Sequence, residues 1–103
     1  MRQLVDVAHA RSGDKSGSVN IGVIVTRRAD VPVVARALTP ARIRRALGLP
    51  ASQPVEVFAL PGLGAFNVLL PGALGGAPTH TLSFDVFGHY YGARILTLEI
   101  PDA

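Results

Sequence analysis

Cysteine and tryptophan are absent from this chain of 103 residues, and lysine occurs only once. Without cysteine the chain can form no disulfide framework, no thiolate metal site and no catalytic thiol. No apolar run approaches the ~18 residues that a membrane-spanning helix needs. The first ten residues contain Asp6 and lack the apolar core of a secretory signal. We therefore expect a cytoplasmic protein that does not contact membranes.

Charged residues make up only 17% of the chain, whereas hydrophobic residues make up 49%. This composition excludes a disordered polar segment and is typical of a folded protein. The length predicts one domain over residues 1–103, with a core of modest size. The net charge of +3 arises from nine arginines and one lysine. Such a small excess is compatible with anionic small molecules as well as with nucleic acid.

Five segments have the apolar and β-branched pattern of strands: residues 2–8, 20–26, 54–60, 79–85 and 92–100. The second of them is apolar on both faces, which predicts a central strand covered on both sides. The last two are separated by a short turn that contains Gly88, so we expect them to form a hairpin.

Two consecutive helices are predicted between the second and third strands. Asp30 is a candidate N-cap for a helix over residues 31–38. Thr39 and Pro40 have the pattern of an N-cap followed by the first residue of a helix, and Gly48 is a typical C-terminal stop. The order of elements predicts an α+β fold, a mostly antiparallel sheet with helices on one face.

Residues 60–78 are rich in glycine and proline and otherwise almost entirely apolar. A solvent-exposed linker would be polar, so we expect a packed, irregular loop with a short helical turn near residues 65–70. Two roles remain open for this segment: a loop that covers the core, or a partly exposed contact surface for another protein.

The segment HARSGDKSGSVN, residues 9–20, places unusual polar chemistry between two predicted strands, and we interpret it as a loop. Arginine offers a planar fork to carboxylates and phosphates, and successive backbone N–H groups near glycines can form a nest for anions. The candidate anion-binding residues are His9, Arg11, Ser12, Gly13, Asp14, Lys15 and Asn20.

Two other interpretations of this loop remain open. Asp14 can pair with Arg11 or Lys15 and accept backbone N–H bonds, which would make the loop a structural turn. Histidine and carboxylate side chains can also transfer protons, so His9 and Asp14 are candidates for such chemistry. No catalytic residue is predicted, and whether the chain is an enzyme stays open.

Several familiar sites are excluded or disfavoured. The Walker pattern is absent because Asp14 separates Gly13 from Lys15. The three histidines have no metal-ligand spacing, so no metal site is predicted, and no cofactor is expected. The aromatic cluster FGHYYG, residues 87–92, lacks the RNP1 pattern, which makes nucleic-acid binding the weakest hypothesis.

Two motifs together resemble a known family. The sequence HARSGDK is followed by NIGV, and LPGLGAFNVLLPGALGG comes further along the chain. In this combination and order the chain resembles the small C-terminal ferredoxin-fold domain of the acyclic terpene utilisation (AtuA-like) family. The resemblance extends from about residue 4 to residue 100. It implies a ferredoxin-like sandwich that usually accompanies a larger domain and also occurs as a short separate chain.

The resemblance also implies an association with acyl-CoA or terpenoid catabolism. Our leading hypothesis is an accessory or interaction module whose partner is a larger AtuA-like protein or further copies of the chain. The alternative is a self-sufficient small protein that binds an anion or acyl-CoA, or an enzyme, through His9, Arg11, Asp14 and Lys15. A basic nucleic-acid-binding domain is the weaker alternative.

Overall fold

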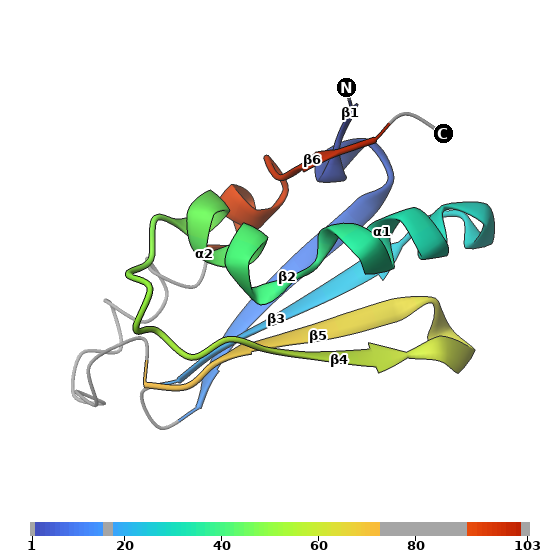
Figure 1. The fold of residues 1–103 in the computed structure, drawn as a ribbon. Helices are drawn as coiled ribbons and strands as arrows, with labels where there is room; N and C mark the ends of the chain where they lie inside the picture. Colours follow the sequence, from blue (N-terminus) through green and yellow to red (C-terminus); the bar gives the residue numbers. More distant parts are fainter. Residues whose placement is uncertain (1, 16–17, 73–90, 102–103) are drawn as a thin grey trace.

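The computed structural model describes residues 2–15, 18–72 and 91–101, without the side chains of Asp14, Lys15 and Pro61. Figure 1 shows its elements in chain order. They are β1 (Arg2–Gln3), β2 (Ala8–Lys15), β3 (Ser18–Val25), α1 (Val31–Ala37), α2 (Pro40–Leu47), β4 (Glu56–Leu60), β5 (Ala65–Leu70) and β6 (Glu99–Ile100). Short 3₁₀ turns at Leu4–Asp6, Arg28–Asp30 and Pro61–Leu63 connect some of them.

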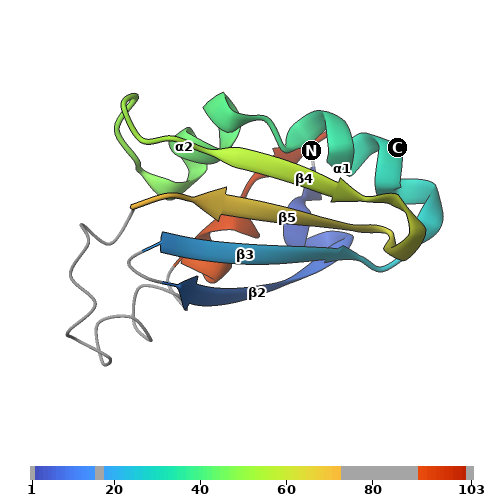
Figure 2. The same cartoon turned by 90° about the horizontal axis from the view of Figure 1, so that it is seen from below.

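The four longer strands form one antiparallel sheet in the order β2-β3-β5-β4. The short strands β1 and β6 form a separate antiparallel pair. Both helices and this pair lie on the same side of the large sheet (Figure 1). In the turned view of Figure 2 the four strands lie in front of the helices, and no described element covers them. The predicted α+β class, an antiparallel sheet with helices on one face, is confirmed.

The core fills the space between the large sheet and the helices. The central strand β3 contributes four buried residues with a period of two, because alternate side chains of a strand point to the same face. Residues from β5, both helices and the last segment complete this layer. The side chains with the least exposure are Leu4, Val19, Ile21, Val23, Val34, Ile43, Val68, Leu70, Ile95 and Ile100.

The second helix begins and ends as the sequence predicts. The Thr39 hydroxyl accepts a hydrogen bond from the backbone N–H of Arg42 at 3.3 Å, and Pro40 is the first residue of α2. Gly48 ends the helix in the left-handed conformation, with φ of 68°. Both signals are local, so the predicted boundaries of α2 are confirmed.

Asp30 does not cap the first helix. Its backbone is helical and its side chain makes no capping hydrogen bond to α1. The carboxylate is instead buried, and it forms ion pairs with Arg2 at 3.7 Å and Arg27 at 3.5 Å. Arg27 is close to Asp30 in sequence, but Arg2 comes from the N-terminal strand, a contact that proximity in sequence does not indicate.

The predicted first strand over residues 2–8 is interrupted. The Asp6 carboxylate accepts a hydrogen bond from the backbone N–H of Gln3 at 2.9 Å, and the N–H of Val7 donates to Leu4. These bonds close a 3₁₀ turn at Leu4–Asp6, which separates β1 from β2. Asp6 therefore terminates the strand instead of lying within it.

The segment over residues 60–78 is mostly a hairpin in its described part, and the predicted helical turn at residues 65–70 is wrong. Those residues form β5, which is hydrogen-bonded to β3 on one side and β4 on the other. Glycine and proline are confined to the connections: Pro61–Leu63 is a 3₁₀ turn, and Gly64 has a φ of 59°. Residues 73–78 lie outside the described part of the chain.

The predicted C-terminal hairpin is wrong in its second strand, residues 92–100. Residues 91–95 are helical, and only Glu99–Ile100 is a strand, which pairs with β1. Tyr91 and Ile95 share one face of this short helix and are both buried. Residues 79–85, the predicted first strand of the hairpin, lie outside the described residues. No helix in the described part of the chain is long and apolar enough to cross a membrane.

Candidate functional site: the open face of the sheet

The polar segment over residues 9–20 is a β-hairpin, and its interpretation as a loop is wrong. β2 and β3 pair from Ala8 with Val25 as far as Lys15 with Ser18. The small residues Ala8 and Ala10 face the core, and the polar residues His9 and Arg11 alternate with them. This alternation has the period of a half-buried strand.

The face of the large sheet opposite the helices is the candidate site, and we call it the open face. In β3 and β5 its residues alternate with buried residues, and in β2 and β4 they are the residues that pair, strand by strand, with that same set. It consists of His9, Arg11 and Gly13 from β2; Asn20, Gly22 and Ile24 from β3; Ala65, Asn67 and Leu69 from β5; and Glu56, Phe58 and Leu60 from β4.

The register of the strands arranges these twelve residues in three rows across the sheet. The first row is Gly13, Asn20, Leu69 and Glu56; the second is Arg11, Gly22, Asn67 and Phe58; the third is His9, Ile24, Ala65 and Leu60. Neighbours within a row are about 5 Å apart, and adjacent rows are about 7 Å apart. The open face therefore has a defined order of charged, polar and apolar groups.

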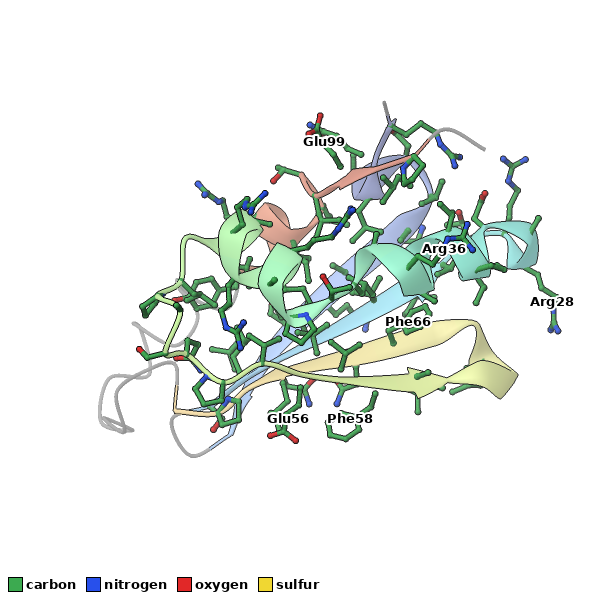
Figure 3. All side chains as sticks on the ribbon, viewed as in Figure 1. Arg28, Arg36, Glu56, Phe58, Phe66 and Glu99 are labelled. Atoms are coloured by element: carbon green, nitrogen blue, oxygen red, sulfur yellow. The ribbon has the colours of Figure 1, made fainter. Side chains whose placement is uncertain are left out.

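Three large apolar side chains of the open face are exposed to solvent. Ile24 retains 44% of its exposure, Phe58 47% and Leu60 42%. Figure 3 shows Phe58 and Glu56 pointing away from the helices, whereas Phe66 of the neighbouring strand points toward them. The prediction that residues 20–26 are covered on both sides is therefore wrong for this face. A contiguous apolar patch bordered by polar residues is typical of a contact surface.

The charged groups of the open face lie at its two edges. Arg11 and His9 are exposed on the edge strand β2, and Glu56 is exposed on the opposite edge strand β4. Three strand spacings across the sheet and one row along it separate Arg11 from Glu56, a distance of about 16 Å. None of the ion pairs or side-chain hydrogen bonds found among the described residues involves Arg11, His9 or Glu56. These charges are therefore available to a binding partner.

The structure brings together four of the seven residues predicted to bind an anion. His9, Arg11, Gly13 and Asn20 share the open face. Ser12 points to the other face, where a Cβ atom added at Gly92 would collide with its hydroxyl oxygen. The backbones of Asp14 and Lys15 continue β2, and their side chains lie outside the described part of the structure. Ser12 is thus separated from the other predicted ligands.

Two hollows found on the described surface lie away from the open face. One, of about 360 Å³, is bordered by Arg42, Arg45 and Glu99 between α2 and the C-terminal segment. The other, of about 430 Å³, lies beside Leu63 and Arg28 at the turn between β4 and β5. The third arginine of α2, Arg44, donates a hydrogen bond to the backbone oxygen of Gln53 at 2.7 Å.

The apolar part of the open face is a site that the sequence does not predict. The sequence pattern places Ile24 in a covered strand, and it places Phe58 and Leu60 in a strand without indicating a role. The sequence indicates this patch only weakly, because residues 54–60 have apolar side chains on both faces of the predicted strand. Only the position of the helices decides which face of the strand is exposed.

Comparison with known proteins agrees with this architecture. A family model described as the AtuA ferredoxin-like domain matches residues 2–101. No curated protein and no solved structure matches the chain. The family match covers nearly the whole sequence, and an antiparallel sheet with helices on one face agrees with the α+β layers of a ferredoxin-like domain. The chain therefore belongs to the AtuA ferredoxin-like domain family.

Proposed function

We propose that this chain is an accessory interaction module in acyl-CoA or terpenoid catabolism, and that it works through the open face. The observation that carries the proposal is the exposed patch formed by Ile24, Phe58 and Leu60 on the face of the sheet opposite the helices. Membership of a family of small domains supports an accessory role. The covering protein is either a larger AtuA-like protein or a second copy of the chain.

The apolar patch is large enough to contribute measurable affinity. Full burial of one such side chain contributes about 1.5–3 kcal/mol, and less than half of each side chain is still exposed, so each contributes about 1 kcal/mol on binding. Together the three contribute about 3 kcal/mol, which corresponds to a factor of about 100 in the dissociation constant. A charge placed among them would have to be buried without a partner.

The proposal is tested by placing a carboxylate on the open face. Sedimentation velocity is measured for the chain alone and mixed with a larger AtuA-like protein, using the wild type and Ile24→Glu. We expect the wild type to form at least one of the two complexes and Ile24→Glu to weaken that complex by about 100-fold. Val5→Glu is the matched control, because Val5 is 51% exposed but lies outside the open face.

Thermal unfolding of each variant shows whether the fold is retained, so that a loss of binding is not confused with a loss of structure. The proposal would be contradicted if the wild-type chain stays monomeric and also does not bind the larger AtuA-like protein. Equal weakening by Ile24→Glu and Val5→Glu would show that the open face has no special role.

A second candidate function is the binding of an anionic ligand at the β2 edge. The observation that favours it is the pair of exposed groups, Arg11 and His9, beside the side-chain-free surface at Gly13 and Gly22. A guanidinium that has no other partner can donate two parallel hydrogen bonds to a phosphate or carboxylate. An acyl-CoA would add apolar contacts to the neighbouring patch.

Thermal unfolding in the presence of CoA, acyl-CoAs of increasing chain length, phosphate and citrate tests this candidate. We expect a concentration-dependent rise in melting temperature that is larger for longer acyl chains and is lost in Arg11→Ala. Arg28→Ala is the matched control, because Arg28 is exposed on a 3₁₀ turn outside the open face (Figure 3). A shift that Arg28→Ala removes equally would show only nonspecific attraction to positive charge.

A further inference from the structure

We infer that the open face binds a second copy of this chain, with a two-fold axis parallel to the strands; the inference rests on the proposed function of that face. A second copy is the partner because the charges and side-chain sizes on the open face of one copy complement those on the open face of another. An axis in the plane between two stacked sheets can run along the strands or across them, and the two choices bring different residues together.

An axis along the strands places β2 of one copy over β4 of the other, and β3 over β5. Each residue then faces a residue of the same row in the second copy, because this axis preserves position along the strands. The six facing pairs are Gly13 with Glu56, Asn20 with Leu69, Arg11 with Phe58, Gly22 with Asn67, His9 with Leu60, and Ile24 with Ala65. Aligned sheets cross at about 30°, so these pairs hold to within about one row.

The charges of the open face are complementary in this arrangement. Arg11 faces the aromatic ring of Phe58 of the second copy, a favourable cation–π geometry. Glu56 of the second copy lies one row away, about 7 Å along the strand and within reach of an arginine side chain. The two-fold axis creates each of these contacts twice. By contrast, an axis across the strands would place Arg11 against Arg11, where like charges repel.

The sizes of the side chains are complementary as well. In three of the six facing pairs, a glycine or alanine lies opposite a larger side chain: Gly13 with Glu56, Gly22 with Asn67, and Ala65 with Ile24. Stacked layers interdigitate when large and small residues alternate across the contact. The axis across the strands would instead place Gly22 against Gly22 and leave a gap.

The size of the face predicts a weak dimer. Four strands span about 19 Å across, and the three rows with their margins span about 20 Å along the strands, which gives about 400 Å² for each copy. Stable interfaces bury about 800 Å² for each partner, and smaller ones are weak or transient. We therefore expect an equilibrium between monomer and dimer that depends on protein concentration.

A charge-exchange experiment tests the arrangement, with sedimentation velocity over a wide range of concentration. Arg11→Glu and Glu56→Arg each create two like-charge contacts between copies, and we expect each to raise the dissociation constant at least about tenfold. An equal mixture of these two variants should dimerise like the wild type, because the carboxylate introduced in one chain then lies beside the guanidinium introduced in the other. Arg28→Glu, a charge reversal outside the open face, should have no effect.

Recovery in the mixture cannot come from within one chain. Arg11 and Glu56 are about 16 Å apart on the same sheet, further than the screening length of about 8 Å at physiological salt. Both side chains are exposed on edge strands, so the variants should fold, and thermal unfolding checks that they do.

The outcomes separate this inference from the proposed function. A wild type that is monomeric at every concentration but binds a larger AtuA-like protein overturns the dimer and leaves the interaction module intact. If the chain dimerises but neither Arg11→Glu nor Glu56→Arg weakens the dimer, the face-to-face arrangement is wrong. A dimer formed through the edge strands would give this result. A folded mixture that fails to recover dimerisation overturns the axis along the strands.

Discussion

The contact between Gly92 and Ser12 gives the sharpest test of how the β2 edge is constructed. Gly92 belongs to the short helix over residues 91–95, which packs on β2 on the core side. A Cβ atom at this position would collide with the hydroxyl oxygen of Ser12, whereas the Ser12 Cβ atom would be 3.7 Å away, an ordinary contact. The collision therefore involves only the hydroxyl group.

We expect Gly92→Ala to destabilise the fold by about 1–2 kcal/mol. Relief of the collision requires the Ser12 hydroxyl to rotate out of its present position, or the helix to shift, and such overpacking costs about 1–3 kcal/mol. Alanine is favoured over glycine inside a helix by up to about 1 kcal/mol, which offsets part of this cost. For a chain of this length the melting temperature should fall by roughly 4–15 °C.

Urea unfolding of Gly92→Ala, Ser12→Ala and the double variant measures the coupling between the two positions. Because alanine at residue 12 has no hydroxyl, the double variant should recover the loss caused by Gly92→Ala, with a coupling energy of about 1–3 kcal/mol. Gly13→Ala is the control, since a Cβ atom at Gly13 would meet nothing within 4 Å. A Gly92→Ala variant as stable as the wild type would contradict the predicted collision, and with it the assignment of Ser12 to the packed face.

Two further predictions concern stability away from the open face. Asp30→Ala removes the buried carboxylate that pairs with Arg2 and Arg27, so urea unfolding should show a loss of about 1–3 kcal/mol, and an unchanged midpoint would contradict the role of these ion pairs. Thr39→Ala removes the N-cap of α2 and should lower the free energy of unfolding by about 1 kcal/mol, whereas Thr39→Ser keeps the hydroxyl and should be close to the wild type.

Local signals in the sequence were reliable where one turn of chain decides the structure. Thr39, Pro40 and Gly48 define α2 through backbone hydrogen bonds and a left-handed residue that involve only near neighbours. Asp30 carries an equally good capping pattern, but its carboxylate pairs with Arg27 and Arg2 instead. The contact with Arg2 is distant in sequence, and no local pattern reveals it.

Glycine misled the interpretation of two strands. Gly13 lies within β2, and the glycines around residues 60–72 flank β5, yet both regions resemble loops in sequence because glycine is common in turns. Pairing with neighbouring strands supplies the hydrogen bonds that hold these residues extended. β5 is hydrogen-bonded to a strand on each side, and these hydrogen bonds outweigh the low strand propensity of the glycines and prolines that flank it.

The class of fold, the second helix, the family, and the presence of His9, Arg11 and Asn20 in one polar segment all follow from the amino-acid sequence. Which of these residues share a surface depends on the packing of the strands and helices. Side chains of a strand alternate between two faces, so the set that remains exposed is known only when the register and the side covered by helices are both fixed. The register and the position of the helices separate Ser12 from Arg11, and they place Arg11 in one row with Gly22, Asn67 and Phe58 on the open face.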